Sequence, residues 1–208
     1  IFLHMQPTKN IILDLGGVLL NLSFAKTEQA FAELGLHDFS KHFTLSSYTP
    51  LFEEFEIGAV NKAEFLTHFK KQTGTTASDE AIIAAWNNML LDFPEERIQW
   101  LDKLSGQYRV FLYSNTNAFH YDAFQESFSM AYPGKSFDDY FEKAYYSHLL
   151  GKRKPHPESF TYLLSEAGLA ANETLFVDDT FPNIEGAQQA GLKTVHLTGG
   201  KTVLDILI

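Results

Sequence analysis

Short apolar runs that end abruptly at a polar residue constrain the fold of this chain more than any other feature. Residues 11–13, 109–113 and 174–177 are such runs, a weaker one lies at 143–147, and residues 193–197 are expected to form a fifth strand. Unbroken apolar runs with β-branched residues are typical of strands that are buried on both faces of a parallel sheet. Helical patterns bounded by Gly or Pro alternate with these runs. The alternation predicts an α/β fold with a parallel sheet and right-handed crossovers.

A long block between the first two predicted strands breaks this alternation. Residues 22–90 show helical patterns and no strand signal, and Ser23, Asn61 and Ser78 each precede a helical pattern as expected capping residues. An all-α block inserted after the first strand predicts a separate small lid. The expected division is a core of residues 6–20 and 91–208 and a helical cap of residues 21–90.

Composition excludes several classes of function. The 208 residues include 26 acidic and 16 basic side chains, and the resulting net charge of -10 makes nucleic acid and anionic membranes unexpected partners. The chain has no cysteine, which excludes zinc thiolate sites and cysteine catalysis and suits a reducing compartment. Apolar runs stay well below the ~18 residues of a membrane-spanning helix. We therefore expect a cytoplasmic protein.

Polar residues follow the predicted strands at their carboxyl ends. They are Asp14, Ser114, Asn115, Lys154, Asp178 and Asp179. Taken singly, each has a plain structural explanation as a turn residue, a helix cap or a solvated charge. The carboxyl ends of parallel strands lie along one edge of the sheet, however, and ligands bind at that edge. All of these residues at one edge therefore favour a functional site.

The residue types at this edge suit phosphoryl transfer. Two carboxylates can bind Mg²⁺, which takes few protein oxygens and keeps waters for a substrate phosphate, and a carbonyl at Gly16 could be a third ligand. A lysine, a hydroxyl and backbone N–H groups can neutralise phosphoryl oxygens. Asp14 is then positioned to attack phosphorus and form an aspartyl-phosphate.

Four segments together resemble the motifs of the haloacid dehalogenase-like hydrolase superfamily. They are DLGGVL at Asp14, YSNTN from Tyr113, RKP around Lys154 and FVDDTFPNIEGA from Phe176. The motifs occur in order and the resemblance spans residues 9–197. It implies a Rossmann-like, doubly wound parallel sheet with the first strand central. It also implies a helical cap inserted after the first motif, which agrees with the lid expected above.

The resemblance also implies a role for each matching residue on the metal side. Asp14 corresponds to the nucleophile and a metal ligand, Gly16 to a carbonyl ligand and Asp179 to the acidic ligand. Asp178 and Asn183 would lie next to these ligands and hold them in position without binding the metal themselves. Many members have Asp at the position of Asn183, so this departure is expected to weaken metal binding. The implied cofactor is Mg²⁺.

On the phosphate side, the resemblance implies that Ser114, Asn115 and Lys154 bind phosphate. Lys154 would also be catalytic, because it would bridge the nucleophile and the phosphate. The implied partner is a small phosphorylated metabolite. Specificity is expected to lie in the loops of the cap.

Gly16 is the larger departure from the superfamily pattern. Most of its phosphatases carry Asp two residues after the nucleophile, and this Asp protonates the leaving oxygen. General acid help is typically worth ~10²–10⁴-fold in rate. One subgroup, the bacterial sugar-phosphate phosphatases that include glucose-1-phosphate phosphatases, shares DLG at the first motif. We therefore expect a Mg²⁺-dependent phosphatase that acts through an aspartyl-phosphate on Asp14.

Two alternatives stay open. A catalytically reduced, phosphate- or metabolite-binding regulatory protein would also tolerate Gly16. A 2-haloacid dehalogenase uses its first Asp on carbon, but it needs no metal, and the Asp178/Asp179 pair argues against it.

Some polar residues are not expected to take part. Glu53 and Glu56 lie in a cap segment that resembles the FxxFExG region of the sugar-phosphate subgroup. A Phe/Glu pattern at helical spacing more often marks a core with a solvated face, so neither Glu is counted in the site. His120 and His156 lie near the second and third motifs and are expected at the surface or behind the site.

Overall fold

The computed structural model describes residues 7–37, 39, 43–44, 47–48 and 50–206. Its main sheet has five parallel strands in the order β5-β4-β1-β6-β7. They are β1 (Asn10–Leu13), β4 (Arg109–Ser114), β5 (Lys143–Tyr146), β6 (Thr174–Asp178) and β7 (Lys193–His196). The central β1 is fully buried, and its Leu13 pairs with Leu112 and Val177 of its two neighbours. The predicted α/β fold with the first strand central is confirmed.

Helices cover both faces of this sheet. Alternate residues of β1 enter two apolar clusters, with Ile11 and Leu13 on one side and Ile12 on the other. The first cluster includes residues of α6 (Glu95–Ser105) and α7 (Ala118–Ala131). The second includes residues of α9 (Pro157–Glu166) and α10 (Phe181–Gln189). Successive side chains of a strand point to opposite faces of the sheet, so β1 contacts a helix layer on each face, as the prediction of a doubly wound sheet requires.

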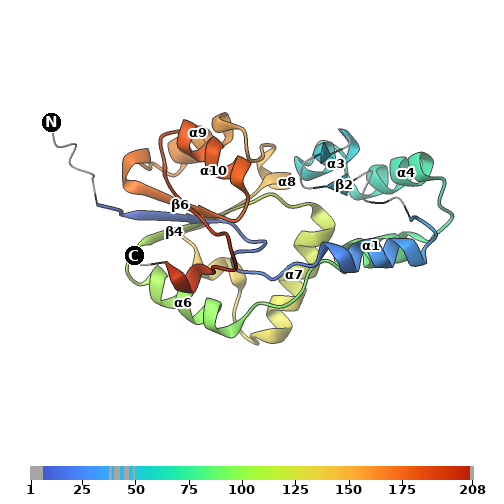
Figure 1. Cartoon of the computed structure of the whole chain (residues 1–208), viewed down its shortest axis with the longest axis horizontal. Coiled ribbons are helices and arrows are strands. Elements are labelled where there is room, and N and C mark those ends of the chain that lie inside the picture. Colours follow the sequence, from blue (N-terminus) through green and yellow to red (C-terminus); the bar gives the residue numbers. More distant parts are fainter. Residues whose placement is uncertain (1–6, 38, 40–42, 45–46, 49, 207–208) are drawn as a thin grey trace.

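The segment inserted after β1, at the right of Figure 1, forms a third apolar cluster of its own. Its described helices are α1 (Phe24–Glu33), α3 (Pro50–Glu56), α4 (Lys62–Thr73) and α5 (Asp79–Asn87). Trp86 is central to it, with ring centroids 4.9 Å from Phe65 and 5.1 Å from Phe52. Phe119 of α7 also joins this cluster, so the cap packs directly on the core.

Helix starts were partly predictable. Asn61 and Glu64 form the expected capping box at α4, and the Ser78 hydroxyl accepts a hydrogen bond from the backbone of Ala81 at 3.2 Å. Ser23 is the N-cap residue of α1 but makes no capping hydrogen bond with its side chain. Pro94 precedes α6 as its N-cap instead of standing at its first helical position.

The prediction of a cap without strands is wrong. Residues Phe43–Thr44 (β2) and Ser47–Tyr48 (β3) pair as an antiparallel two-stranded sheet. Strands of two residues are too short to leave the alternating pattern by which strands are recognised. The structure also starts α8 (Ser147–Leu150) at the last residue of the predicted third strand, and α10 starts at Phe181 instead of residue 184. The expected start of the core at residue 6 lies outside the described residues.

The two segments that join cap and core are hydrogen-bonded to each other. Asn21 N–H donates to the Asp92 carbonyl at 3.0 Å, and Leu91 N–H donates to the Asn21 carbonyl at 3.0 Å. Ser23 N–H donates to the Met89 carbonyl at 2.9 Å. Residues 21–23 and 89–92 therefore form a paired linker ribbon.

Three short 3₁₀ helices complete the described elements, at Phe137–Tyr140, Ala171–Glu173 and Val203–Asp205. None of the described helices combines the length and the apolar character that a membrane crossing requires.

Candidate active site

The predicted site residues converge at the carboxyl ends of the strands, where a cleft of about 400 Å³ opens between core and cap. The core contributes Asp14, Gly16, Ser114, Asn115, Lys154, Asp179 and Asn183 to its lining. The cap and its linker contribute Phe24, Glu56 and Met89. The parallel topology explains this convergence, because β1, β4 and β6 are adjacent and all end at this edge.

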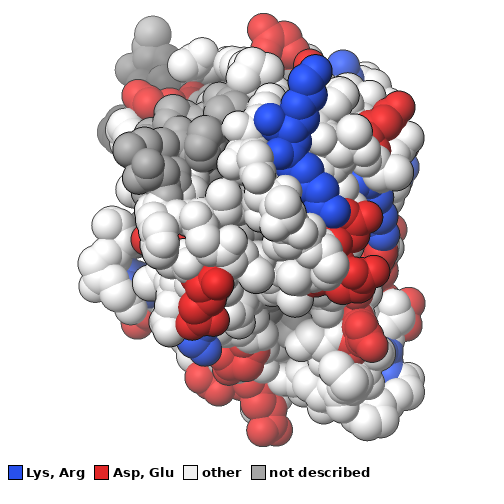
Figure 2. Space-filling model, turned by 90° about the vertical axis from the view of Figure 1, so that its right-hand side faces the viewer, with Lys and Arg blue, Asp and Glu red and all other residues white. Residues whose placement is uncertain are grey.

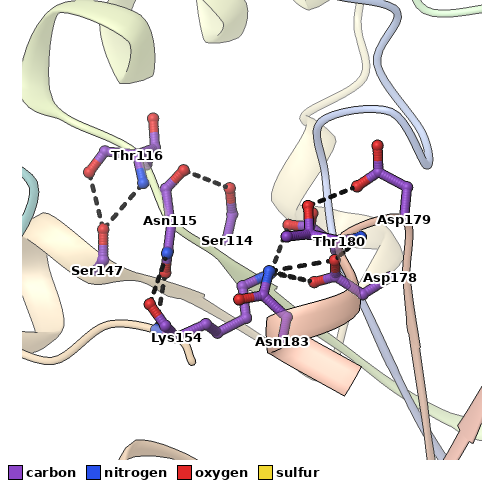
Figure 3. Close-up of polar contacts among 10 residues, drawn as sticks. Ser114, Asn115, Thr116, Ser147, Lys154, Asp178, Asp179, Thr180 and Asn183 are labelled. Carbon is purple, nitrogen blue, oxygen red and sulfur yellow. Dashed lines mark hydrogen bonds and ion pairs between the residues drawn. The ribbon is translucent and has the colours of Figure 1, made fainter. Parts of the chain in front are cut away.

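Lys154 is the central charge of the site. Its side chain is 1% exposed, and its Nζ lies 2.8 Å from Asp14 Oδ1. The same Nζ lies 2.7 Å from Asp178 Oδ2 (Figure 3). Burial alone would lower the pKa of Lys154, but the charges of the two carboxylates raise the pKa above its ordinary value. Lys154 therefore stays charged and holds two aspartates together.

Asp178 is fully buried, and its carboxylate is already well supplied with donors. It accepts hydrogen bonds from the Thr180 backbone N–H at 2.7 Å and from Asn183 Nδ2 at 3.0 and 3.1 Å, in addition to Lys154 (Figure 3). Its remaining capacity for a metal is small. This geometry suits a residue that positions Lys154.

Asn115 connects the loop after β4 to the loop that carries Lys154. Its Oδ1 accepts from the Lys154 backbone N–H and its Nδ2 donates to the Lys154 carbonyl, both at 3.0 Å (Figure 3). The Ser147 hydroxyl bonds both the N–H and the carbonyl of Thr116 at 2.9 Å. The amide of Asn115 thus fixes the loop that carries Lys154, while the nearly buried hydroxyl of Ser114 lines the cleft.

The site carries more negative than positive charge. Asp14, Asp178 and Asp179 each offer a carboxylate oxygen, and these oxygens lie within 4.8 Å of one another. Burial raises the pKa of Asp14 to about 7; Lys154 opposes this shift, and the two neighbouring aspartates add to it. Burial and Asp178 likewise raise the pKa of Asp179.

Three clustered carboxylates with one lysine call for a further cation. An all-oxygen donor set is the kind that Mg²⁺ prefers, so the donors present fit this ion. Asp14 and Asp179 would hold it with a carbonyl from the Gly16 turn. Asp178, which is committed to its hydrogen-bond donors, would remain behind them.

Two consecutive glycines shape the turn after Asp14. Gly17 has a φ of +72°, and a Cβ on it would lie 2.1 Å from Asp179 Oδ2. Only glycine fits there, because any side chain would strike a carboxylate of the site. A Cβ on Gly16 would meet Leu22 Cδ1 at 2.6 Å, so this linker residue occupies the space next to it.

The structure adds cleft residues that were not expected in the site. Glu56 is buried in the cleft, and its Oε2 lies 3.0 Å from Nε of Arg153, the residue before Lys154. His120 is also buried and lines the cleft, whereas His156 lies at the surface with its side chain 60% exposed. The place of Arg153 as the first residue of the RKP motif and the FExG pattern around Glu56 were the available signals.

Comparison with known proteins finds relatives along almost the whole chain. A D-ribitol-5-phosphate phosphatase from Bacteroides thetaiotaomicron is 33% identical over 193 residues, which are 92% of this chain and 93% of that protein. This relative does not single out the glucose-1-phosphate phosphatases within the family. The expected resemblance to the glucose-1-phosphate phosphatase subgroup is therefore not supported beyond the family level.

Solved structures agree with this result. A haloacid dehalogenase family enzyme from Bacteroides thetaiotaomicron, in complex with magnesium and inorganic phosphate, superposes with a TM-score of 0.84 at 35% identity, covering 93% of this chain and 96% of that one. A haloacid dehalogenase-like hydrolase from Porphyromonas gingivalis gives a TM-score of 0.85 at 30% identity over 94% of each chain.

The family model described as haloacid dehalogenase-like hydrolase matches residues 8–191. This range contains all four motifs and every residue of the cluster around Lys154. The chain belongs to the haloacid dehalogenase-like hydrolase family.

Proposed function

We propose that this protein is a Mg²⁺-dependent phosphatase of a small phosphorylated metabolite, and that its reaction passes through an aspartyl-phosphate on Asp14. The observation that carries the proposal is the buried cluster in which Lys154 bonds Asp14 and Asp178 beside Asp179. Its excess of negative charge suits a divalent cation. The related enzyme crystallised with magnesium and inorganic phosphate supports the same cofactor and product.

Each residue of the site has a separate role in the proposed reaction. A carboxylate oxygen of Asp14 attacks phosphorus, and the bond from phosphorus to the leaving oxygen breaks. Water then hydrolyses the aspartyl-phosphate, which releases inorganic phosphate and restores Asp14. Lys154 and the hydroxyl of Ser114 line the same cleft and can donate to the phosphoryl oxygens. Magnesium, when bound, supplies charge neutralisation for the transferring phosphoryl group.

Recognition of an anionic substrate then depends on the interior of the cleft. The net charge is -10, and the cap side of the molecule shows acidic groups in several places with one line of basic groups near the top (Figure 2). Lys154 and Arg153, which both line the cleft, are the local positive features. A phosphate would therefore be held by these groups and the metal instead of by the outer surface.

A sugar or polyol phosphate is the substrate class that we favour. The relative named D-ribitol-5-phosphate phosphatase supports it, because the match covers more than nine-tenths of both chains. The cleft volume of about 400 Å³ is in the range of small-molecule sites. Polar groups of Glu56, Arg153 and Thr116 line part of this cleft and can meet hydroxyl groups.

A panel of phosphorylated metabolites, assayed with Mg²⁺ and with chelator, tests the proposal. Wild type, Asp14→Asn and the exposed control Asp102→Asn are compared for phosphate release. We expect turnover that needs both the metal and Asp14 and that the control retains.

Two other outcomes would point elsewhere. Phosphate or metabolite binding without turnover would favour the regulatory alternative. Halide release from a 2-haloacid, unaffected by chelator, would favour a dehalogenase.

A further inference from the structure

Gly16 leaves the proposed phosphatase without the side chain that usually protonates the leaving oxygen. The structure shows that this space is filled, because Leu22 Cδ1 lies 2.6 Å from where a Cβ on Gly16 would be. Leu22 has no proton to give. A proton donor for the reaction must therefore come from another wall of the cleft, and this argument rests on the proposed phosphatase function.

Few ionisable side chains line the cleft. In the described part of the chain they are Asp14, Glu56, His120, Arg153, Lys154 and Asp179. The nucleophile, the other metal ligand and the paired lysine already have tasks, and arginine does not release its proton. His120 remains with Glu56. Burial lowers the pKa of His120 to about 4, so its imidazole is neutral near pH 7 and is a poor acid.

Glu56 has the environment of a proton donor. It ends α3, its side chain is 7% exposed, and its Oε2 lies 3.0 Å from Arg153 Nε. Arg153 Nη1 also lies 3.6 Å from Glu53 Oε1. One guanidinium thus faces two carboxylates, and Glu53, at 45% exposure, keeps its contact with water. The buried carboxylate is the one for which ionisation is costly.

The surroundings of Glu56 favour its protonated form up to near neutral pH. Burial raises the pKa of Glu56 to about 7; Arg153 and Lys154 oppose the rise and Glu53 adds to it. His148, on the neighbouring α8, is neutral near pH 7 because burial lowers its pKa to about 4. A carboxyl group with a pKa near the working pH can both give and take a proton.

We infer that Glu56, carried into the cleft by the cap, is the general acid–base residue that replaces the side chain missing at Gly16. As Asp14 attacks phosphorus and the bond to the leaving oxygen breaks, the carboxyl proton of Glu56 moves to that oxygen and an alcohol departs. The carboxylate of Glu56 then takes a proton from the water that attacks the aspartyl-phosphate. Asp14 and inorganic phosphate are released, and Glu56 is protonated again.

Close contact between cap and core holds Glu56 in place. Gly58, two residues after Glu56, has a φ of +70°, and a Cβ on it would lie 2.2 Å from the carbonyl oxygen of His148 in the core. Arg153, in the loop that also carries Lys154, forms an ion pair with the carboxylate of Glu56. Proton transfer is therefore available only while the cap is seated on the core.

The leaving group separates proton donation from the rest of catalysis. Glycerol 1-phosphate releases an alkoxide that needs a proton, whereas p-nitrophenyl phosphate releases a phenolate that does not. We expect Glu56→Gln to lower kcat/KM for glycerol 1-phosphate about 10²–10⁴-fold and to leave that for p-nitrophenyl phosphate within about 10-fold. Glu53→Gln, on the same helix and facing the same guanidinium, is the matched control and should keep both activities.

The pH profile and a second variant give independent readouts. In wild type, kcat/KM for glycerol 1-phosphate should fall as pH rises above about 7, because the acid form of Glu56 is lost, and Glu56→Gln should remove this limb. Glu56→Asp keeps the carboxyl group and should restore part of the activity.

Equal losses on both substrates, or no loss on either, would overturn the assignment of Glu56. A wild-type protein that hydrolyses neither substrate with Mg²⁺ would instead overturn the phosphatase function itself.

Discussion

Replacing Lys154 by methionine tests the charge balance of the site most directly. Lys154 is 1% exposed and bonds Asp14 and Asp178 at 2.8 and 2.7 Å, so Lys154→Met roughly keeps the volume of the side chain and removes its charge together with these two bonds. Loss of one partner of a buried ion pair costs about 3–5 kcal/mol. Domains are stable by about 5–15 kcal/mol, so the variant should still fold.

Urea denaturation with chelator measures this cost. With a slope of about 2–3 kcal/mol/M, the midpoint should fall by about 1–2.5 M at pH 7.5. Lys152→Met, an exposed lysine in the same loop, is the control and should stay within about 0.5 kcal/mol of wild type. Mg²⁺ at a hundred times its Kd stabilises by about 2.7 kcal/mol, and the variant should gain at least as much as wild type.

The stability of Lys154→Met relative to wild type should also depend on pH in a predictable direction. The pKa of Asp14 rises from 3.8 to about 7 on folding, so its ionisation destabilises the folded state as pH increases through this window. Without Lys154, which opposes that rise, the pKa would be higher still. The stability deficit of Lys154→Met should therefore shrink between pH 7.5 and pH 5. A variant as stable as wild type at pH 7.5 without metal would refute the reasoning.

Three further substitutions probe the turn and the metal ligands. Gly17→Ala places a Cβ 2.1 Å from Asp179 Oδ2 and should weaken Mg²⁺ binding about 10–100-fold; unchanged calorimetric affinity would contradict the steric argument. Gly16→Asp should destabilise by about 1–3 kcal/mol because it meets Leu22, and adding Leu22→Ala should recover most of the loss in thermal denaturation. Asn183→Asp removes two hydrogen bonds to a buried carboxylate, each worth about 1.5–3 kcal/mol, and should destabilise the chelated protein more than the Mg²⁺-loaded one.

Local patterns were sufficient to predict the edge at which the site lies. The strand ending at Asp14 is a buried apolar run, and the one before Asp178 is another, so a parallel sheet brings both ends together. The capping box at Asn61 was predictable for the same reason, because its two partners are three residues apart. Such features depend on near neighbours in sequence.

Contacts between distant segments could not be predicted in this way. Glu56 meets Arg153 only because the cap folds over the core, and a helical Phe/Glu pattern does not reveal which Glu becomes buried. The sequence also did not show that the side-chain amide of Asn115, a residue predicted to bind phosphate, makes hydrogen bonds with the backbone of Lys154. The two-residue strands of the cap were missed because they are too short to show a period.

The paired linker ribbon makes the two connections of the cap behave as one hinge. Residues 21–23 and 89–92 share backbone hydrogen bonds, so sliding one past the other would break them, whereas a swivel about the ribbon preserves them. Leu22 lies within this ribbon, and Glu56 lies in the cap that the ribbon joins to the core. A swivel that opened the cleft to admit substrate would thus also move Glu56, the acid that we infer, away from Asp14, and the reverse motion would bring the two together again.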